Sequence, residues 1–334
     1  MTTRRPSRRS LLTGLAAATA LLSLTACGAT DAATEAATDK GAPKGAKGAG
    51  SAVNLGPEQH RIRTAKVDAL AAKLPEAVRK RGTLTLGVST SGAPPLAFYA
   101  TDDRTLIGSE LDIATLVADT LGVKPEFTPV SWENLFVGLD SGKFDGVISN
   151  VTVTEERKDK YDFATYRLDD LAFEARKGAG WRVKGPADVA GRTIAVSSGT
   201  NQEKILVDWS RQNEKAGRKP VDIKYFQTQS DYYLALRSGR IDAYLGPSPT
   251  AAFHVAQAGQ TEIVGKFSGA GSGLQGKIAA ATKKDNGLVE AYAGALQHII
   301  DNGSYAQVLK RWGLGDEAVA RSEINPPGLP RTAN

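Results

Sequence analysis

Two spacings of apolar residues alternate along the chain, and each spacing predicts a different kind of element. Short runs rich in apolar residues predict strands at residues 83–89, 127–130, 146–148, 171–176, 222–226 and 241–246. Apolar residues that recur every three or four positions predict helices at residues 64–81, 109–121, 230–236, 286–301 and 304–312. Because strands and helices alternate, the sequence predicts an α/β fold with mostly parallel sheets flanked by helices.

Two of these helices carry end signals in the sequence. The helix expected at residues 64–81 is followed by Gly82, a residue type that often terminates helices. Ser109 and Asp112 have the spacing of a capping box, in which two side chains satisfy free backbone N–H groups of the first turn. Ser109 is therefore expected to cap the helix that follows it.

Polar side chains gather where the strand at residues 146–148 ends. Ser149, Asn150 and Thr152 follow that strand, and ligands of open α/β sheets bind beyond the carboxyl ends of strands. Thr154 is expected to cap a helix, and Arg157, one turn further, can reach the crevice and hold a carboxylate with two hydrogen bonds. The alternative is a solvated arginine that pairs with a neighbouring acidic residue.

A second helix start offers a similar environment after the strand that begins at Thr193. Gly199 permits a close approach of the backbone, and the N–H groups of Thr200, Asn201 and Gln202 suit an anion. An ordinary helix cap has the same sequence features, so this pattern alone is weak evidence for a binding site. Its value is that it supplies a second anion-binding helix start.

Six motifs follow one another in a specific order between the first strand and the middle of the chain. They are Gly-Ser-Glu-Leu-Asp-Ile-Ala from Gly108, Leu-Gly-Val-Lys-Pro-Glu-Phe from Leu121, Val-Ser-Trp-Glu-Asn-Leu from Val130, Leu-Asp-Ser-Gly-Lys-Phe-Asp-Gly-Val-Ile from Leu139, Thr-Val-Thr-Glu-Glu-Arg-Lys from Thr152 and Tyr-Asp-Phe-Ala from Tyr161. Over about residues 84–314, the chain resembles the family 3 extracellular solute-binding proteins of ABC importers, whose best-known members bind amino acids.

The resemblance implies a two-lobed periplasmic-binding-protein-like fold of type II. It also implies a monomeric, non-enzymatic receptor without a cofactor, which closes over a small solute and delivers it to an ABC permease and its ATPase. Trp132 matches a position that lines the ligand pocket in the family, although a tryptophan there could also belong to the core. Closure would bring the Arg157 side of the crevice against the Thr200 side.

Two positions depart from the family pattern. Ala93 stands where a loop of the family often brings an aromatic ring over the ligand, and Pro247 stands where amino-acid binders have an aspartate for the ligand ammonium. A buried ammonium without an acceptor is strongly unfavourable. We therefore expect a small carboxylate-bearing solute, an amino acid or a derivative, with Glu110 as one possible substitute partner for an ammonium group.

The N-terminal segment has the pattern of an export signal. Four arginines precede an apolar run that is too short to span a membrane, and Leu-Thr-Ala-Cys at its end resembles a bacterial lipobox. Cys27 is the only cysteine, and we expect it to be acylated, so that the mature protein is anchored by lipid on the extracytoplasmic face of the cell membrane. The Arg8-Arg9 pair leaves the Sec and twin-arginine routes open.

The positive charge of the chain comes largely from the predicted signal and says little about nucleic acid, and we expect no nucleic-acid partner. The formal charge of the whole chain is +6, but the segment before Cys27 holds four arginines and no acidic residue. The remaining 38 basic and 36 acidic residues give +2. The sequence predicts this organisation: a signal peptide at 1–26, a flexible lipid-anchored linker at 27–60, lobe 1 at 61–170, lobe 2 at 171–265, a return to lobe 1 at 266–316 and an irregular tail at 317–334.

Two other functions fit the same fold class. An enzyme similar to cyclohexadienyl dehydratase would need a positioned acid or base, yet all three histidines fall outside the strand-end motifs. Asp169 and Asp170 are adjacent and are expected in a solvated turn, not as a carboxylate pair. A ligand-gated sensor would normally need a fused signalling segment after the binding module. A metal site has no cluster of histidine and cysteine to support it.

Overall fold

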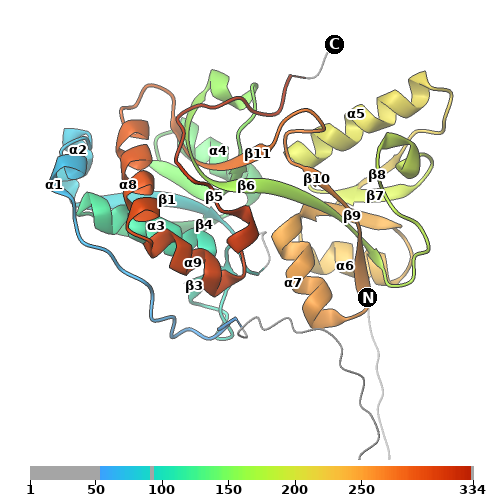
Figure 1. Ribbon diagram of the computed structural model, residues 1–334, viewed down its shortest axis with the longest axis horizontal. Coiled ribbons are helices and arrows are strands. Elements are labelled where there is room, and N and C mark those ends of the chain that lie inside the picture. Colours follow the sequence, from blue (N-terminus) through green and yellow to red (C-terminus); the bar gives the residue numbers. More distant parts are fainter. Residues whose placement is uncertain (1–52, 91–93, 332–334) are drawn as a thin grey trace, which may run out of the picture. The chain divides into compact units, whose positions relative to one another are not determined.

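The structure is a computed structural model that describes residues 53–90 and 94–331 (Figure 1). The predicted signal, Cys27, most of the predicted linker and Ala93 lie outside the described residues. The helices are α1 (Asp68–Ala71), α2 (Glu76–Arg81), α3 (Ser109–Leu121), α4 (Trp132–Asp140), α5 (Asn201–Lys215), α6 (Gln229–Arg237), α7 (Ser248–Ala258), α8 (Val289–Asp301) and α9 (Ser304–Trp312), with 3-10 helices η1 (Arg157–Asp159), η2 (Pro186–Val189) and η3 (Gly315–Glu317). The strands are β1 (Thr83–Ser89), β2 (Phe98–Tyr99), β3 (Leu106–Ile107), β4 (Lys124–Val130), β5 (Gly146–Thr152), β6 (Tyr161–Arg176), β7 (Thr193–Val196), β8 (Asp222–Tyr225), β9 (Ala243–Pro247), β10 (Thr261–Ser268) and β11 (Gly276–Lys283).

The main sheet has parallel pairs at its two ends and antiparallel pairs in its middle. Its strand order is β4-β1-β5-β11-β6-β9-β7-β8, and β10 also pairs with β6. β1 is parallel to β4 and β5, and β7 is parallel to β8 and β9. β11 and β6 are antiparallel to their neighbours, and the two segments that cross between the halves, β6 and the segment from β10 to β11, run in opposite directions. The α/β fold is thus confirmed, with mixed sheets.

The 16-residue strand β6 runs through both halves of the sheet (Figure 1). Its first part pairs with β11, and its second part pairs with β9 and β10. We call the half with β1, β4, β5, β11 and helices α3, α4, α8 and α9 lobe 1, and the half with β7 to β10 and helices α5 to α7 lobe 2.

Each lobe has its own buried core. In lobe 1, Leu84 and Leu86 of β1 pack with Ile113 and Leu116 of α3, and all four side chains are fully buried. In lobe 2, Phe173 of β6 belongs to a separate apolar cluster with residues of β7, β9 and α5. Because each core can exclude water by itself, the space between the lobes is free to hold polar groups.

The prediction of one leading helix over residues 64–81 is wrong in two respects, because the helical part begins at Asp68 and is split in two. α1 ends at Ala71, and α2 starts at Glu76 directly after Pro75. Proline has no backbone N–H, and its ring clashes with the preceding turn, so a helix cannot run through this position. Both short helices lie against lobe 1. Their apolar residues therefore still face one core, which explains why the spacing over residues 64–81 resembled that of a single helix.

The predicted capping box at Ser109 is also wrong. α3 begins at Ser109 itself, its N-cap is Gly108, and the buried Ser109 hydroxyl has no hydrogen-bond partner. Gly108 has φ +131°, and a Cβ there would lie 2.0 Å from the carbonyl oxygen of Leu96. This close approach of the backbone fixes the start of the helix one residue earlier than the side-chain pattern suggested.

The helix expected after Thr154 is reduced to the single 3-10 turn η1. The Thr154 hydroxyl does accept a hydrogen bond from the Arg157 N–H at 3.0 Å, as a cap should. The turn ends at once because β6 starts at Tyr161. Arg157 is therefore placed by a tight turn and not by a helix face.

The segments at both ends of the described chain contact the lobes. Val53 and Leu55, at the end of the predicted linker, pack against the core of lobe 1. Near the C-terminus, the Leu329 N–H donates to the Val153 carbonyl at 3.0 Å, and the Leu329 carbonyl accepts from the Glu155 N–H at 2.9 Å. The Leu329 side chain is buried in the cluster of lobe 2. The tail therefore bonds to lobe 1 and packs into lobe 2.

Candidate functional site

A cleft with a free volume of about 100 Å³ lies between the two lobes. Lobe 1 contributes Ser89, Leu96, Ala97, Glu110, Trp132, Ser149 and Asn150. Lobe 2 contributes Ser197, Thr200, Asn201, Gln202, Gln227, Tyr232, Tyr244, Leu245, Pro247 and Thr250. Hydroxyl, amide and aromatic groups surround this space, and such groups orient ligands in binding pockets.

Six of the eight predicted binding residues line this cleft, and two do not. Trp132, Ser149, Asn150, Thr200, Asn201 and Gln202 line it. Thr152 is buried behind the cleft, where its hydroxyl donates to Asp169. Arg157 lines an adjacent opening together with Gly199 and Thr200.

Arg157 joins the two lobes through backbone carbonyls. Its Nη1 donates to the Thr152 carbonyl at 2.9 Å, and its Nη2 donates to the Gly199 carbonyl of lobe 2 at 3.1 Å. The guanidinium carbon lies 5.4 Å from the ring of Trp132 and 5.1 Å from the ring of Phe136. Burial lowers the pKa of Arg157 to about 10, so the group still carries its charge at neutral pH.

Trp132 makes a second contact with the same carbonyl. Its Nε1 donates to the Gly199 oxygen at 3.2 Å from the start of α4. On the other side, the Gly199 N–H donates to Glu203 at 2.6 Å. Gly199 has φ +73°, a conformation that glycine adopts readily, and this turn directs its carbonyl toward lobe 1.

Thr200 is the N-cap of α5, which begins where the sequence predicted a helix start. Its hydroxyl accepts from the Glu203 N–H at 3.2 Å and donates to the Ser197 carbonyl at 2.7 Å. The Asn201 side chain donates to Asp169 at 3.0 Å and to the Gly269 carbonyl at 3.0 Å. These contacts hold the start of α5 against β6 and the segment that leads to β11.

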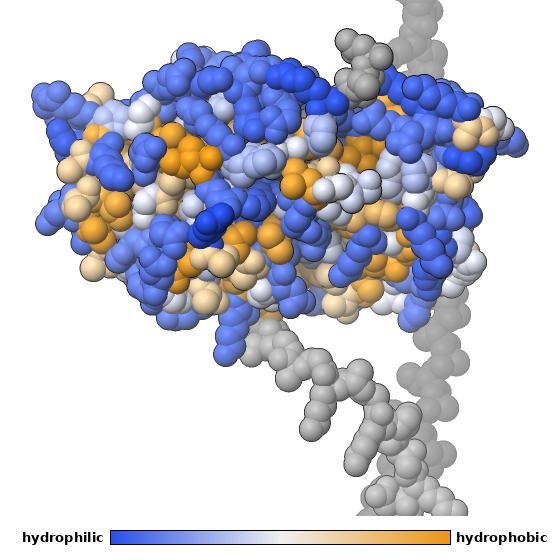
Figure 2. Space-filling view, turned by 45° about the horizontal axis from the view of Figure 1, so that its top comes forward, coloured by the Kyte–Doolittle hydropathy of each residue, from blue (hydrophilic) through white to orange (hydrophobic). Residues whose placement is uncertain are grey.

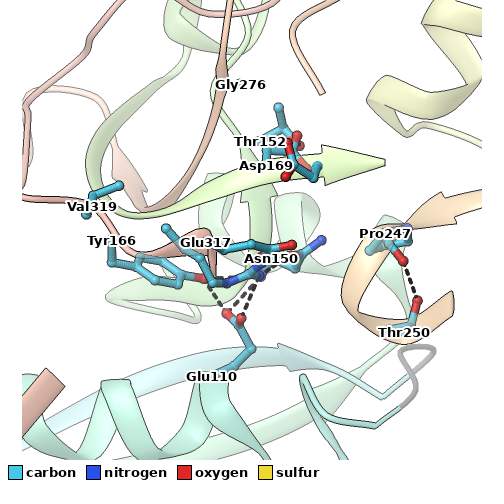
Figure 3. Close-up of polar contacts among 12 residues, drawn as sticks. Glu110, Asn150, Thr152, Tyr166, Asp169, Pro247, Thr250, Gly276, Glu317 and Val319 are labelled. Carbon is cyan, nitrogen blue, oxygen red and sulfur yellow. Dashed lines mark hydrogen bonds and ion pairs between the residues drawn. The ribbon is translucent and has the colours of Figure 1, made fainter. Parts of the chain in front are cut away.

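The expectation of a solvated turn at Asp169 is wrong. Asp169 lies within β6 and is buried, while the adjacent Asp170 is partly exposed. One carboxylate oxygen of Asp169 accepts from both Thr152 and Asn201, and Figure 3 shows Asp169 beside Thr152. Burial raises the pKa of Asp169 to about 6, and the hydrogen bond from Thr152 opposes this shift.

Asn150 is locked by a buried polar network that includes Glu110 (Figure 3). The Asn150 N–H donates to Glu110 at 2.9 Å, and the Tyr166 hydroxyl donates to the same carboxylate oxygen. Arg167 donates to the Asn150 side-chain oxygen and, at 3.1 Å, to the second oxygen of Glu110. Asn150 has φ +53°, which asparagine tolerates better than most residues.

Arg167 also pairs with Glu317, which follows α9 far along the chain. Burial alone lowers the pKa of Arg167, but the carboxylates of Glu317 and Glu110 outweigh burial, so its pKa is raised. Burial raises the pKa of Glu317 to about 7, against the effect of Arg167. Glu110 can therefore face the cleft as an acceptor, but its charge is already matched by Arg167.

Pro247 lies at the end of β9, where it lines the cleft and supplies no charge. Its carbonyl accepts from the Thr250 hydroxyl at 2.8 Å, a contact also drawn in Figure 3. Nearby in lobe 2, the rings of Tyr232 and Tyr244 stack with centroids 3.7 Å apart. Burial raises the pKa of both tyrosines, so both remain neutral.

Some residues that line the cleft were not predicted from the sequence. Only some of these could have been recognised from their positions along the chain. Ser89 is the last residue of β1 and Ser197 directly follows β7, so the strand-end rule that found Ser149 applies to both. Tyr232 and Tyr244 come from α6 and β9, and nothing local in the sequence distinguishes them from core tyrosines. Trp312 packs in the core, as predicted.

Two other observations bear on the class of site. Among the described residues, no group of three or more histidine, cysteine, aspartate or glutamate side chains could hold a metal ion. Within the same ranges, the structure contains no helix with both the length and the apolar character needed to cross a membrane.

A two-lobed α/β fold with a polar cleft between the lobes defines the architecture of a solute-binding protein. The family described as bacterial extracellular solute-binding proteins, family 3, matches residues 84–315, and the chain belongs to this family. The resemblance inferred from the motifs is thus confirmed.

The curated relatives include amino-acid-binding proteins. The chain is 32% identical to the L-cystine-binding protein TcyJ of Escherichia coli (strain K12), over 70% of this chain and 84% of that protein. It is 29% identical to the arginine-binding protein ArgT of Corynebacterium glutamicum, over 79% of this chain and 84% of that protein. These named relatives are binding proteins and not enzymes.

Solved structures of arginine-binding proteins have the same fold. An ancestral arginine-binding protein bound to arginine is 31% identical, with a TM-score of 0.61 over 70% of this chain and 98% of that one. The P235GK mutant of ArgBP from T. maritima is 27% identical, with a TM-score of 0.61 over 71% of this chain and 98% of that one. A third similar structure, at 25% identity and a TM-score of 0.59 over 71% of this chain and 97% of that one, is the ancestral amino acid-binding protein AncCDT-1, a precursor of cyclohexadienyl dehydratase.

Proposed function

We propose that the protein is the lipid-anchored substrate-binding component of an ABC importer and captures a small carboxylate-bearing solute, an amino acid or a derivative, between its lobes. The observation that carries the proposal is the cleft between the lobes, which both lobes line with hydroxyl and amide groups. Family membership and the amino-acid-binding relatives support the same class of solute.

The carboxylate of the solute is assigned to Arg157. Two of its five N–H donors meet carbonyl oxygens, and one of these carbonyls, that of Gly199, belongs to the opposite lobe. A ligand carboxylate offers the same kind of acceptor with a full negative charge, so it can replace the Gly199 carbonyl or share the guanidinium with it. The ligand thereby supplies contacts to both lobes that favour the closed state.

A thermal-shift screen of residues 53–334 against amino acids, amines, small carboxylates and short peptides tests the proposal. A solute at one hundred times its dissociation constant adds about 2.7 kcal/mol of stability, which shifts the melting temperature measurably. Binding of carboxylate-bearing solutes is expected. A domain that is folded but shifted by none of these solutes would contradict the proposed function.

Calorimetric titration of the identified solute then tests Arg157. Arg157→Ala should weaken binding by about 2–5 kcal/mol, because it leaves a desolvated carboxylate unpaired. Arg211→Ala is the matched control, since Arg211 borders the same outer opening but is exposed on α5. Equal affinities for the wild type and Arg157→Ala would exclude the assigned carboxylate site.

Pro247→Asp tests the expectation about the missing ammonium partner. An aspartate at the end of β9 would place a carboxylate at the cleft wall. We expect it to raise the affinity for zwitterionic amino acids without loss of the fold. Tight binding of ordinary amino acids by the wild type, with no gain in the variant, would show that the wild-type cleft already supplies that partner.

The lipid anchor is a separate proposal, which rests on Leu-Thr-Ala-Cys27 after the apolar run. In the producing bacterium, Cys27→Ser should remove the acylated mass and release the protein from the membrane fraction. Unchanged mass and membrane retention in the variant would contradict lipidation at this cysteine. The anchored protein would face the outside of the cell membrane, where a permease and its ATPase are the proposed partners.

The surface is consistent with a monomeric receptor. Among the described residues, the large hydrophobic side chains that are exposed are Tyr99, Val137, Tyr225, Leu234 and Ile324. They come from different elements and do not adjoin in sequence. Figure 2 shows one face, on which hydrophilic residues predominate and hydrophobic residues form small separate groups. We accordingly propose a monomer, which sedimentation at increasing concentration would test.

A further inference from the structure

The half of the cleft that lobe 2 supplies carries no charge. Its ten lining residues are serine, threonine, asparagine, glutamine, tyrosine, leucine and proline, and none is acidic or basic. The charged side chain that lines the cleft is Glu110 of lobe 1, and Arg167 is paired with it. A charged group of the solute would therefore lose its hydration in lobe 2 without meeting an opposite charge there.

Gln202 of this half has a buried side-chain oxygen that lacks a hydrogen-bond partner. It lies in the first turn of α5, lines the cleft and is 5% exposed, and its Oε1 is buried without a hydrogen bond. The neighbouring side chains of Thr200 and Asn201 already donate hydrogen bonds, Thr200 to a backbone carbonyl and Asn201 to a backbone carbonyl and to Asp169. A buried amide oxygen without a partner is destabilising by about 1–3 kcal/mol, which a ligand at this position can recover.

The other groups of this half suit a flat and uncharged ligand group. Tyr232 and Tyr244 present stacked, neutral rings, and the interplanar angle between them is 2°. Pro247 has no N–H, and its carbonyl is taken by Thr250. These walls offer apolar area and no charge to a ligand group, so the Gln202 amide supplies a free and buried polar contact.

We propose that Gln202 is a specificity-determining residue, and that it selects solutes that present a neutral amide to lobe 2 in preference to an ammonium or guanidinium group. An amide has both an N–H donor and a carbonyl acceptor, so it pairs with the glutamine amide in either orientation of that side chain. This inference rests on the proposed function, because it assumes that the cleft binds a carboxylate-bearing solute.

The amide can belong to the side chain of an amino acid or to an acylated α-nitrogen, and two matched pairs of probes distinguish these sources. L-Citrulline and L-arginine have the same length, but citrulline ends in a neutral ureido group and arginine ends in a charged guanidinium. N-acetyl-L-alanine has a neutral amide at its α-nitrogen, where L-alanine has a charged α-ammonium. In calorimetric titration of residues 53–334, the neutral member of at least one pair should bind about tenfold more tightly.

Two substitutions then test Gln202 itself. Gln202→Leu should weaken the neutral probe about tenfold or more, and Gln202→Glu should shift the preference toward the charged member of that pair. Gln212→Glu is the matched control, because it makes the same change at an exposed position of the same helix, outside the cleft lining. Circular dichroism and ligand-free melting temperatures establish that each variant is folded.

The outcomes separate this inference from the function on which it rests. If the charged members of both pairs bind as tightly as the neutral ones, or if Gln202→Leu leaves all affinities unchanged, the inference is overturned while the proposed function stands. If no carboxylate-bearing solute of the wider panel binds to the folded domain, the proposed function is overturned, and the inference is overturned with it.

Discussion

Single residues on β6 carry ionisable groups that are removed from water. Asp169 and Arg167 are buried on this strand, and each contacts residues that come from distant parts of the sequence. Such groups stabilise the fold only while their partners and their protonation states are right. The stability of the protein therefore depends on pH and on single contacts in this region.

The pH dependence of unfolding should report on Asp169. Its pKa is raised to about 6 from the ordinary 3.8, so the folded state retains a proton that the unfolded state loses first. The free energy of unfolding should therefore fall between about pH 4 and pH 6, by up to about 3 kcal/mol, and this contribution should be constant at higher pH. Asp169→Asn cannot ionise, so urea denaturation should show a smaller fall over this range. An identical fall in the variant would contradict the assignment.

Gly108→Ala should be strongly destabilising, by more than about 3 kcal/mol. The new Cβ would meet the Leu96 carbonyl oxygen at 2.0 Å, in a backbone conformation that other residues rarely adopt. Gly142→Ala is the control, because Gly142 has φ +72° but nothing within 4 Å of the added Cβ. That change should cost only about 1–2 kcal/mol, the penalty for a left-handed residue. Similar losses in both variants, measured by urea denaturation, would show that the contact with Leu96 is unimportant.

The sequence allowed part of the cleft to be predicted, because local rules apply to it. Ser149 and Asn150 lie in the second half of β5 and Thr200 follows β7, and the carboxyl ends of strands collect ligand-binding groups. The contact between Arg167 and Glu317 could not be predicted, since 150 positions separate the two residues. The burial of Asp169 depends in the same way on Asn201 and on the backbone at Gly269.

Among the elements, helices with a clear apolar face were predictable, whereas the first part of β6, the helix α7 and the short connecting segments were not. α8 and α9 have apolar faces that their sequences display, and both were found near their observed bounds. Pro75 divides the leading helix because backbone chemistry outweighs apolar spacing. The C-terminal tail was expected to be irregular, and its backbone bonds to Val153 and Glu155 have no counterpart in any local pattern.

Leu329→Ala tests whether the tail stabilises lobe 2. The Leu329 side chain is 5% exposed and belongs to the cluster of lobe 2, so its truncation should cost about 2–4 kcal/mol of unfolding free energy. Leu234→Ala is the matched control, because Leu234 on α6 is 51% exposed, and it should change stability by less than about 0.5 kcal/mol. If chemical denaturation finds equal small effects, the tail does not contribute to this core.

The whole molecule is held together at three places. β6 runs through both lobes, the segment from β10 to β11 returns to lobe 1, and the tail bonds to lobe 1 and packs into lobe 2. Arg157 and Trp132 add contacts across the cleft through the Gly199 carbonyl. Opening of the cleft must break these last contacts, whereas the two chain crossings, β6 and the segment from β10 to β11, persist.

Small-angle scattering should detect the effect of Arg157 on closure. Ligand-free Arg157→Ala loses one of the two hydrogen bonds to the Gly199 carbonyl, so its average radius of gyration should exceed that of the wild type. Saturation of the wild type with its solute should reduce the radius. A radius that changes neither with the substitution nor with the solute would contradict a closing cleft.

The position of β11 in the sheet constrains the order in which the protein can fold. β11 lies between β5 and β6, yet in the chain it follows all the strands of lobe 2. The strands β4, β1 and β5 are therefore not joined to β6 until β11 (residues 276–283) has paired with both β5 and β6. The strands of lobe 2, from β6 to β10, follow one another in the chain and need no later strand to complete their pairing. Lobe 2 should form first, because its pairings need shorter chain closures. In pulse-labelled hydrogen exchange during refolding, the amides of β7 and β9 should become protected before those of β11.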